Sequence, residues 1–327
     1  MNAKITGTGR YLPEYVLNNE ELSRMVDTSD EWIVTHTGMR ERRIAQGEKC
    51  WEMGVAAAQK ALHDAGVAPE QVDMIIGCSS TPDYLFPPVS CIIQGKLGAK
   101  NAFCIDQMAA CSAFVFALQT ARQYIENRAV KTVLIVCTEQ LSKVTDYTDR
   151  ATCVLFGDGA GAAVVQAAEA GGVLAANCAT DGTGWDLLAC NAIVHKTPFE
   201  KDRPAELPQL HDQYLYMAGH EVFKFAVRAM SSAIDQALAD AGLSAGDIKF
   251  LVPHQANVRI IQTMARRYGF PMDRVVLMLE WYGNTSSASI PIALDELSKS
   301  GALARGDKLI LVGFGGGLTY GAAVVEW

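Results

Sequence analysis

Apolar and polar positions follow two spacings along the chain, one typical of helices and one of buried strands. Residues 50–66 and 221–242 carry apolar side chains at helical spacing, and each segment ends at a glycine, which suits a helix C terminus. Nearly continuous aliphatic runs are typical of strands covered by helices on both faces. Such runs occupy 72–78, 131–139, 248–254 and 307–315. The pattern predicts an α/β fold.

Part of this pattern occurs twice. Residues 61–78 (ALHDAGVAPEQVDMIIGC) return as residues 237–254 (ALADAGLSAGDIKFLVPH), a shift of 176 positions (237 minus 61). The glycine-rich segment at 156–166 returns at 314–327 with a shift of about 160, so we expect the first copy to carry roughly 17 extra residues, LSKVTDYTDRATCVL and neighbours, as a projecting loop. We therefore predict a duplicated fold with an N-terminal half at 1–170 and a C-terminal half at 171–327.

The two copies differ where chemistry is expected. Under the shift of 176, Cys111 aligns with Ser287, while His254 ends a predicted strand and Asn284 comes just before a predicted helix. One half thus offers a thiol, and the other offers an imidazole and an amide. We interpret this as a single cleft supplied by both halves.

Composition narrows the classes of function. The chain has 327 residues, half of them apolar and a fifth charged, with a net charge of −8 and a pI near 5.3. This balance argues against a nucleic-acid partner, although it allows a small basic patch for an acidic protein. The first residues lack the apolar run of a signal peptide, and no segment reaches 18 uninterrupted apolar residues, so we expect a cytoplasmic protein without a membrane span.

Nine cysteines lie within the first 190 residues, and none forms a C-x-x-C pair. An odd count without framework spacing indicates reduced thiols, with neither disulfides nor a zinc site, and most of them are expected to be small buried residues.

Three residues are candidates for catalysis. Cys111 precedes an amphipathic run, and the positive end of a helix dipole would lower its pKa and favour attack on a thioester. His254 follows Pro253 at a strand end, where α/β sheets place ligand sites. Asn284 lies in the turn YGNTSS and, taken alone, is better interpreted as a cap of the helix beginning near Ser286.

The glycine-rich segments GDGAG and GFGGGLTYG are superficially similar to phosphate-binding loops. Each is followed by a short AAVV strand instead of a helix, so the context of a dinucleotide site is missing. We predict tight turns between strands at which the backbone bends or approaches a ligand.

Several long motifs point to a known family. The segments HQANVRI, YGNTSSASIPIAL, GFGGGLTYGAA, DEWIVTHTGMRERRIA and FGDGAGAA resemble β-ketoacyl-acyl-carrier-protein synthase III, the thiolase-fold condensing enzymes that start type II fatty-acid synthesis. The resemblance covers essentially the whole chain. It implies a five-layer αβαβα duplicated fold with two mixed sheets, a homodimer, and acyl-CoA and malonyl-acyl carrier protein as substrates, without cofactor or metal.

Carried over residue by residue, the resemblance assigns roles. Cys111 would accept the primer acyl group, and His254 and Asn284 would donate hydrogen bonds to the enolate formed as carbon dioxide leaves. The backbone N–H groups of Cys111 and Gly316 would form a second oxyanion hole, for acyl transfer.

Further positions match the substrate and partner contacts of the family. Trp32 and Arg150 would stack on the adenine of coenzyme A, and Phe86 would close the acyl pocket of the partner subunit. The basic residues that would dock acyl carrier protein are Lys224, Arg259, Arg266 and Arg267. The alternative for these four is an ordinary solvated helix face.

The chain also departs from the family. His36 stands where an arginine is usual, and ACSAF replaces the more usual ACAGF around the nucleophile. Trp185 occupies a position that is typically small, and the irregular segment after it, 191–214, is longer than usual. Both lie where the family builds its acyl pocket. The sequence therefore leaves open a primer other than acetyl, and Trp185 is expected to restrict or reshape the pocket.

Two alternatives stay open beside the condensing enzyme of fatty-acid synthesis. One is a specialised condensing enzyme or acyltransferase of secondary metabolism with the same fold. The other is a non-catalytic partner in a heterodimeric condensing complex, although such partners usually lack a catalytic residue, and all three are present here.

Overall fold

The computed structural model describes residues 1–191, 198–199 and 213–327. Most of the segment 191–214 therefore lies outside the described residues. No helix in the described part of the chain is long and apolar enough to cross a membrane. Within the same residues, no group of three or more His, Cys, Asp or Glu side chains is placed to hold a metal ion.

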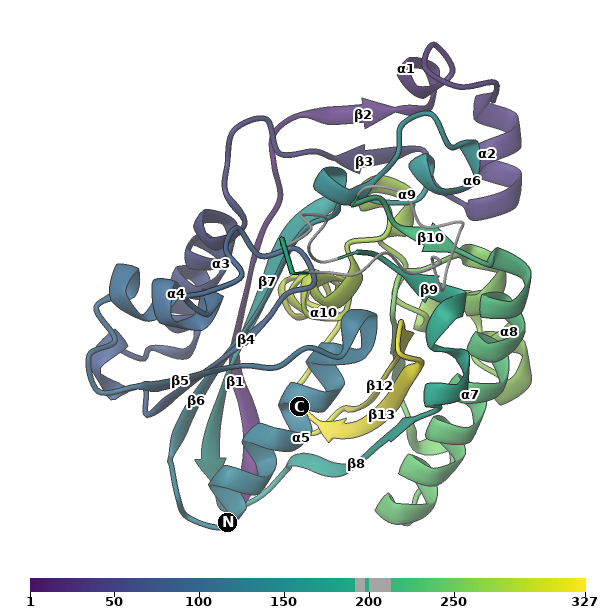
Figure 1. The fold of residues 1–327 in the computed structure, drawn as a ribbon. Helices are drawn as coiled ribbons and strands as arrows, with labels where there is room; N and C mark the ends of the chain where they lie inside the picture. The colour runs from purple at the N-terminus through teal and green to yellow at the C-terminus, as the bar shows by residue number, and fades with distance from the viewer. Residues whose placement is uncertain (192–197, 200–212) are drawn as a thin grey trace.

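The first half forms a mixed five-stranded sheet. Strand β1 pairs antiparallel with β7, and β7 pairs antiparallel with β6, whereas β6, β4 and β5 run parallel. The strand order across the sheet is β1 (Asn2–Tyr11), β7 (Asp158–Ala168), β6 (Thr132–Gln140), β4 (Met74–Cys78) and β5 (Phe103–Asp106). Helices α3 (Cys50–Ala65) and α4 (Val89–Leu97) cover its outer face (Figure 1).

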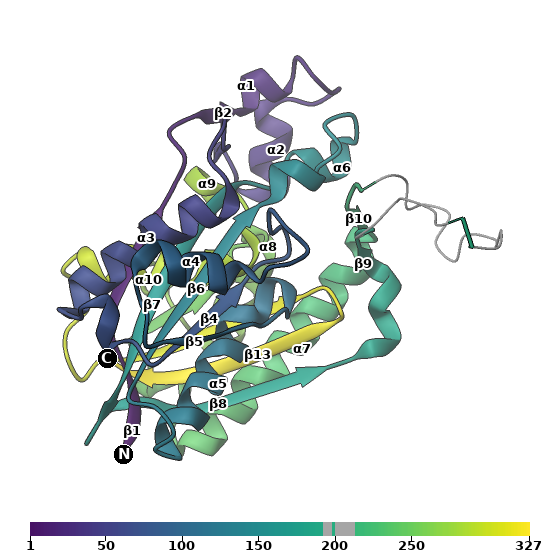
Figure 2. The same cartoon turned by 60° about the vertical axis from the view of Figure 1, so that its left-hand side comes forward.

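The second half forms a smaller mixed sheet. Its strand order is β11 (Phe250–Pro253), β12 (Lys308–Gly315), β13 (Thr319–Glu326) and β8 (Gly172–Thr180). Helices α7 (Gly219–Ala241) and α8 (Val258–Tyr268) cover its outer face, and α5 (Ala113–Glu126) and α10 (Ser289–Lys299) lie between the two sheets (Figures 1 and 2). The layers are thus helix, sheet, helix, sheet, helix, which confirms the predicted architecture.

Shorter elements complete the described chain and lie mostly above the sheets, around the β2–β3 hairpin and along the chain leading into α7. They are β2 (Val16–Asn18), α1 (Asn19–Leu22), α2 (Asp30–Thr37), β3 (Glu41–Arg43), α6 (Arg150–Cys153), β9 (Leu188–Ala189), β10 (Tyr216–Met217) and α9 (Leu279–Tyr282).

The internal repeat is present element by element. Strand β4 begins at 74 and β11 at 250, β6 begins at 132 and β12 at 308, and α5 begins at 113 and α10 at 289, each pair 176 residues apart. The exception is β5, whose counterpart is the short helix α9. The second sheet therefore lacks a fifth strand, and β5 is an edge strand with partly exposed residues.

The expectation of a turn was wrong for GDGAG and right for GFGGG. Gly159 and Gly161 lie inside β7, and a Cβ at Gly161 would be 2.8 Å from the backbone N of Ile292. The first glycines therefore let α10 approach the sheet closely. Gly316 and Gly317, by contrast, form the turn between β12 and β13.

The expectation of a projecting loop for LSKVTDYTDRATCVL was also wrong. This segment forms a short 3-10 turn, Leu141–Val144, and helix α6, with Thr152 and Cys153 buried. The fully buried Arg42 holds it in place, because its guanidinium donates to the backbone oxygen of Val154 at 2.7 Å. Leu141 and residues 152–155 are buried, whereas Thr148, Arg150 and Ala151 are exposed, so the two ends of the segment pack inward and its middle lies at the surface.

Candidate active site

One large cavity lies where the two halves meet. Its volume is about 880 Å³, and its walls are mainly apolar. The structure brings Cys111, His254 and Asn284 together in its lining, as predicted from the divergence of the two copies.

Cys111 lies in a 3-10 turn, Ala110–Ser112, directly before α5. The preceding Ala110 has φ of +45°, an uncommon conformation for a residue with a side chain. The thiol donates a hydrogen bond to the Ser286 hydroxyl, with Sγ and Oγ 3.3 Å apart. Cys111 thus sits on a sharp bend facing the turn that follows Asn284.

The predicted lowering of the Cys111 pKa is not found. Burial raises the pKa of the thiol to about 12, opposed in part by the hydrogen bond to Ser286, and the nearby Glu139 carboxylate raises it further. Desolvation disfavours the charged thiolate, and α5 begins only two residues later, at Ala113. Before substrate arrives, the thiol is therefore protonated at neutral pH.

This protonation state gives a testable pH profile. We expect the rate of Cys111 alkylation by iodoacetamide to rise about tenfold per pH unit from about pH 6 to about pH 9, because the thiolate fraction rises by that factor below the pKa. Peptide-resolved mass spectrometry separates Cys111 from the exposed Cys91, which serves as a reference thiol. A plateau below about pH 8 would show that the thiol pKa is lowered after all.

His254 is buried at the end of β11 with one imidazole nitrogen already engaged. Its Nδ1 lies 2.6 Å from the Ser289 hydroxyl, and Phe314 packs edge-on against the ring at 5.6 Å. Burial lowers the pKa of His254 to about 3, so the ring is neutral at physiological pH. Because the Gln255 N–H donates to the Ser289 oxygen at 3.4 Å, the hydroxyl proton can go to Nδ1, which leaves the ring proton on Nε2.

The side chain of Asn284 is oriented by the backbone of Ser286, two residues further along the chain. Its Oδ1 accepts a hydrogen bond from the Ser286 N–H at 2.9 Å. The amide oxygen therefore caps the turn before α10, in agreement with the cap predicted from the sequence. The amide oxygen is thereby occupied, and the Nδ2 protons remain as donors for the cavity, which the residue lines. Capping and presenting a donor are compatible.

Glycines at the end of β12 and in the turn after it lie beside Cys111. A Cβ at Gly315 would lie only 2.5 Å from the backbone N of Cys111, so no side chain fits there. Gly316, the residue singled out from the sequence, also lines the cavity, and a Cβ on it would meet the Leu188 oxygen at 3.1 Å. The contact that excludes a side chain beside Cys111 therefore falls on Gly315 and not on Gly316, a difference that the sequence motif did not reveal.

Comparison with known proteins decides the family. Residues 105–182 match "3-Oxoacyl-[acyl-carrier-protein (ACP)] synthase III", and residues 238–327 match the "C terminal" part of that family. The "Beta-ketoacyl-[acyl-carrier-protein] synthase III" of Clostridium acetobutylicum is 48% identical over 326 residues, covering 100% of this chain and 99% of its own length. The chain belongs to the 3-oxoacyl-[acyl-carrier-protein] synthase III family. It is therefore a condensing acyltransferase.

Solved structures of relatives agree with this assignment. The crystal structure of 3-oxoacyl-[acyl-carrier-protein] synthase III from Aquifex aeolicus is 42% identical, with a TM-score of 0.92, and the match covers 99% of this chain and 100% of that one. The "Priming beta-Ketosynthase from the R1128 Polyketide Biosynthetic Pathway" is 38% identical, with a TM-score of 0.91, covering 99% of this chain and 96% of that one. Thus the synthase III fold is shown over the described residues.

The predicted adenine-binding pair of this synthase III chain lies together in the structure. The Arg150 guanidinium sits 4.4 Å from the centre of the Trp32 ring. His36, which replaces the usual arginine, stacks nearly parallel on Trp32 at 4.4 Å, with its Nδ1 2.7 Å from the Trp32 backbone oxygen. Arg150 already contacts the ring, so a base entering between them must displace the guanidinium.

Of the two residues predicted to form the acyl pocket, one lines the cavity and the other does not. Trp185 lines the cavity and is 49% exposed. Phe86 is 80% exposed and is not among the lining residues, although its neighbour Leu85 is. Within a single chain, therefore, Phe86 points away from the site.

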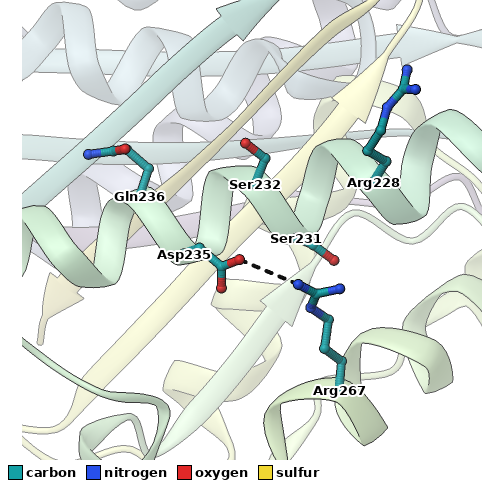
Figure 3. Close-up of a pocket in the computed structure, with 6 residues that line it drawn as sticks. All are labelled: Arg228, Ser231, Ser232, Asp235, Gln236 and Arg267. Atoms are coloured by element: carbon teal, nitrogen blue, oxygen red, sulfur yellow. Dashed lines mark ion pairs between the residues drawn. The ribbon is translucent and has the colours of Figure 1, made fainter.

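The four basic residues predicted to dock a carrier protein lie on α7 and α8, and each has a contact within the chain. Lys224 pairs with Glu221 at 3.1 Å, and Arg267 pairs with Asp235 at 3.5 Å across a surface hollow of about 440 Å³ (Figure 3). Arg259 donates to the Thr35 oxygen at 3.1 Å, and Arg266 to the Gln262 oxygen at 3.3 Å. Exposed pairs of this kind are weak, so they can exchange for an acidic partner.

Proposed function

We propose that the cavity condenses an acyl-CoA primer with malonyl-acyl carrier protein, releasing carbon dioxide and giving a 3-oxoacyl-acyl carrier protein that starts type II fatty-acid synthesis. The observation that carries this proposal is the convergence of Cys111, His254 and Asn284, from both halves of the duplicated fold, on one largely apolar cavity. Neither half contains the full set of groups.

In the first half-reaction the Cys111 sulfur attacks the thioester carbonyl of acyl-CoA. The bond from the acyl carbon to the coenzyme A sulfur breaks, and the departing thiolate takes up the proton that Cys111 loses. The tetrahedral oxyanion accepts hydrogen bonds from the backbone N–H groups of Cys111 and Gly316. Close approach of this backbone is supported by the absence of a side chain at Gly315.

In the second half-reaction the malonyl thioester oxygen accepts hydrogen bonds from His254 and Asn284. The bond to the carboxylate carbon breaks, carbon dioxide leaves, and the electron pair becomes the enolate that attacks the acyl group on Cys111. A neutral donor is needed here, and a His254 with a pKa near 3 meets that need. Release of the Cys111 sulfur completes the reaction.

We also propose the assembly in which this happens. Exposed large apolar residues lie along the β5 edge and the loop at 79–88, a surface that suits a homodimer. They are Tyr84, Leu85, Phe86, Phe103 and Met108. Phe86 would then reach the partner's pocket. Trp32 and Arg150 would bind coenzyme A, and the basic residues of α7 and α8 would bind acyl carrier protein, with no bound cofactor, in the cytoplasm. The halves would divide at 1–170 and 171–327.

The Ser289 hydroxyl should matter for decarboxylation. Ser289→Ala removes the partner of His254 Nδ1 and frees the ring to take the other tautomer, so we expect malonyl decarboxylation to fall about tenfold while acylation of Cys111 is retained. Release of labelled carbon dioxide measures the first step, and mass spectrometry the second. Ser300→Ala, at the far end of α10, is the control; equal rates in both variants would remove Ser289 from the account.

Trp185 should set primer preference. Trp185→Gly removes a large ring from the cavity wall, and we expect the kcat/KM ratio for medium-chain over acetyl primers to rise about tenfold or more. An unchanged preference would show that Trp185 does not shape the acyl pocket.

A panel of acyl-CoA primers with malonyl-acyl carrier protein tests the proposed function. The expected product is a 3-oxoacyl-acyl carrier protein, identified by intact mass. The likeness to a polyketide priming ketosynthase keeps a specialised pathway as a second candidate. A primer used only by such a pathway, with acetyl and branched short chains rejected, would favour that candidate.

A further inference from the structure

The duplication places a second, altered copy of the nucleophile turn opposite the first. Ala110 has φ of +45° and Ser286 has φ of +47°, and the two residues are 176 positions apart, as are Cys111 and Ser287. Both bends have the same uncommon backbone geometry. The turn Ser286–Ala288 is therefore the structural counterpart of the nucleophile turn.

The strand residue facing each turn has diverged as well. Gly315 of β12 packs against the backbone N of Cys111, and the residue 176 positions earlier is Glu139, near the end of β6. Glu139 faces the second turn, where its Oε1 accepts a hydrogen bond from the Ser287 hydroxyl at 2.6 Å. A carboxylate and a hydroxyl thus meet at the second turn, where a glycine and a thiol meet at the first.

Glu139 is fully buried and joins two walls of the cavity. Its Oε2 accepts from the Ser80 N–H at 3.0 Å and from the Thr81 hydroxyl at 2.8 Å. The Thr81 hydroxyl itself accepts from the Gln140 N–H, so its own proton is committed to Glu139. Ser80 and Thr81 line the acyl cavity, at the start of the loop that leads to Phe86.

The other oxygen reaches the catalytic groups through one turn. Ser287 adjoins Ser286, which receives the Cys111 thiol hydrogen bond and whose N–H holds the Asn284 amide oxygen. Tying Ser287 to Glu139 therefore fixes the segment that faces Cys111 and presents Asn284.

We propose that Glu139 is a positioning residue of the condensation reaction: its buried carboxylate locks the Asn284–Ser287 turn of one half to the cavity loop and the nucleophile of the other. This inference rests on the proposed function. The hydrogen-bond donors that face Glu139 come from the loop after β4 and from the turn before α10, so the carboxylate connects elements of both halves. Burial raises the pKa values of Cys50, Cys111 and Cys137, and the charge of Glu139 adds to that rise.

The test is Glu139→Gln, which keeps the size of the side chain and removes the charge and half of its acceptor capacity. We expect kcat for condensation to fall between tenfold and hundredfold, roughly what a misplaced reacting group costs. The KM for acyl-CoA should be unchanged, because Glu139 makes its hydrogen bonds to Ser80, Thr81 and Ser287 and not to Trp32 or Arg150. Alkylation of Cys111 at a fixed pH of about 8 should become faster, because a like charge beside the thiolate is gone. Replacing a residue that only supported folding would change neither the kcat of the folded enzyme nor the alkylation rate of Cys111.

Asp158→Asn is the matched control. Asp158 is a buried carboxylate on β7 whose side chain also accepts only from backbone and hydroxyl donors, at Ala45 and Ser142, and makes no hydrogen bond to the Asn284–Ser287 turn. Its variant should keep kcat and the Cys111 alkylation rate. A Glu139→Gln enzyme with parental kcat, or a loss matched by Asp158→Asn, would overturn the proposal.

Ser287→Ala keeps the question answerable if Glu139→Gln does not fold. It removes one donor to the carboxylate and leaves the charge in place, so we expect a fall in kcat of about tenfold without faster alkylation of Cys111. Parental kcat in Ser287→Ala would contradict the positioning role. If the unaltered chain itself fails to condense primer and malonyl-acyl carrier protein, it is the proposed function that fails.

Discussion

His254→Ala and Asn284→Ala should each slow malonyl decarboxylation about 10²- to 10³-fold while acylation of Cys111 proceeds near the parental rate. Each substitution removes one donor aimed at a developing enolate, and loss of a single oxyanion donor costs about this much. Decarboxylation is followed by release of labelled carbon dioxide from malonyl-acyl carrier protein. Acylation is followed by the mass of the Cys111 peptide after a brief exposure to acyl-CoA.

His220→Ala is the control for these variants, because His220 is an exposed residue at the start of α7. Both half-reactions should be unaffected by it. If His254→Ala or Asn284→Ala slowed acylation as much as decarboxylation, the two residues would not divide the labour as proposed. Because His254 is neutral down to a pH near 3, the decarboxylation rate of the parent enzyme should also show no inflection near pH 6.5 from this residue.

Gly315→Ala should lower the rate of Cys111 acylation by about a hundredfold. The added Cβ would stand 2.5 Å from the backbone N of Cys111, so the nucleophile turn must move by a distance that matters for attack. Overpacking of this kind also lowers the free energy of unfolding by about 1–3 kcal/mol. Acylation is measured by peptide mass and stability by chemical denaturation.

Gly246→Ala provides the comparison, since the nearest neighbour of its added Cβ is the Ser244 hydroxyl at 3.5 Å, far from the cavity. It should change neither acylation nor stability by much. A Gly315→Ala enzyme that acylates at the parental rate would show that the close contact between β12 and Cys111 is not needed for attack.

Much of the fold could be predicted because the pattern of apolar residues that specifies it occurs twice in the sequence. The apolar runs at 72–78 and 248–254 correspond to β4 and β11, and the shift of 176 positions recurs in strands, turns and helices. The family motifs likewise led to Cys111, His254 and Asn284, which the structure places in one cavity. Repetition and long motifs are local signals, and these are the features that a single sequence carries.

What the sequence missed depends on contacts between distant segments. Glu139 is an ordinary acidic residue at the end of an aliphatic run, and only folding brings it to Ser80 and Ser287. The pKa of Cys111 follows the burial of the thiol more than the helix behind it. The segment at 141–155, which contains α6, has many polar residues in its sequence. Arg42 of the β2–β3 hairpin nevertheless holds its end against the core through the Val154 oxygen.

The most direct test is to transfer a labelled acyl group from acyl-CoA to the unaltered chain in the absence of malonyl-acyl carrier protein. The chain is then digested, and the mass of each cysteine peptide is measured. We expect one acyl group per chain, on Cys111, and we expect it to disappear with formation of 3-oxoacyl product when malonyl-acyl carrier protein is added. No label on Cys111, or label on another of the nine cysteines that is consumed instead, would contradict this expectation.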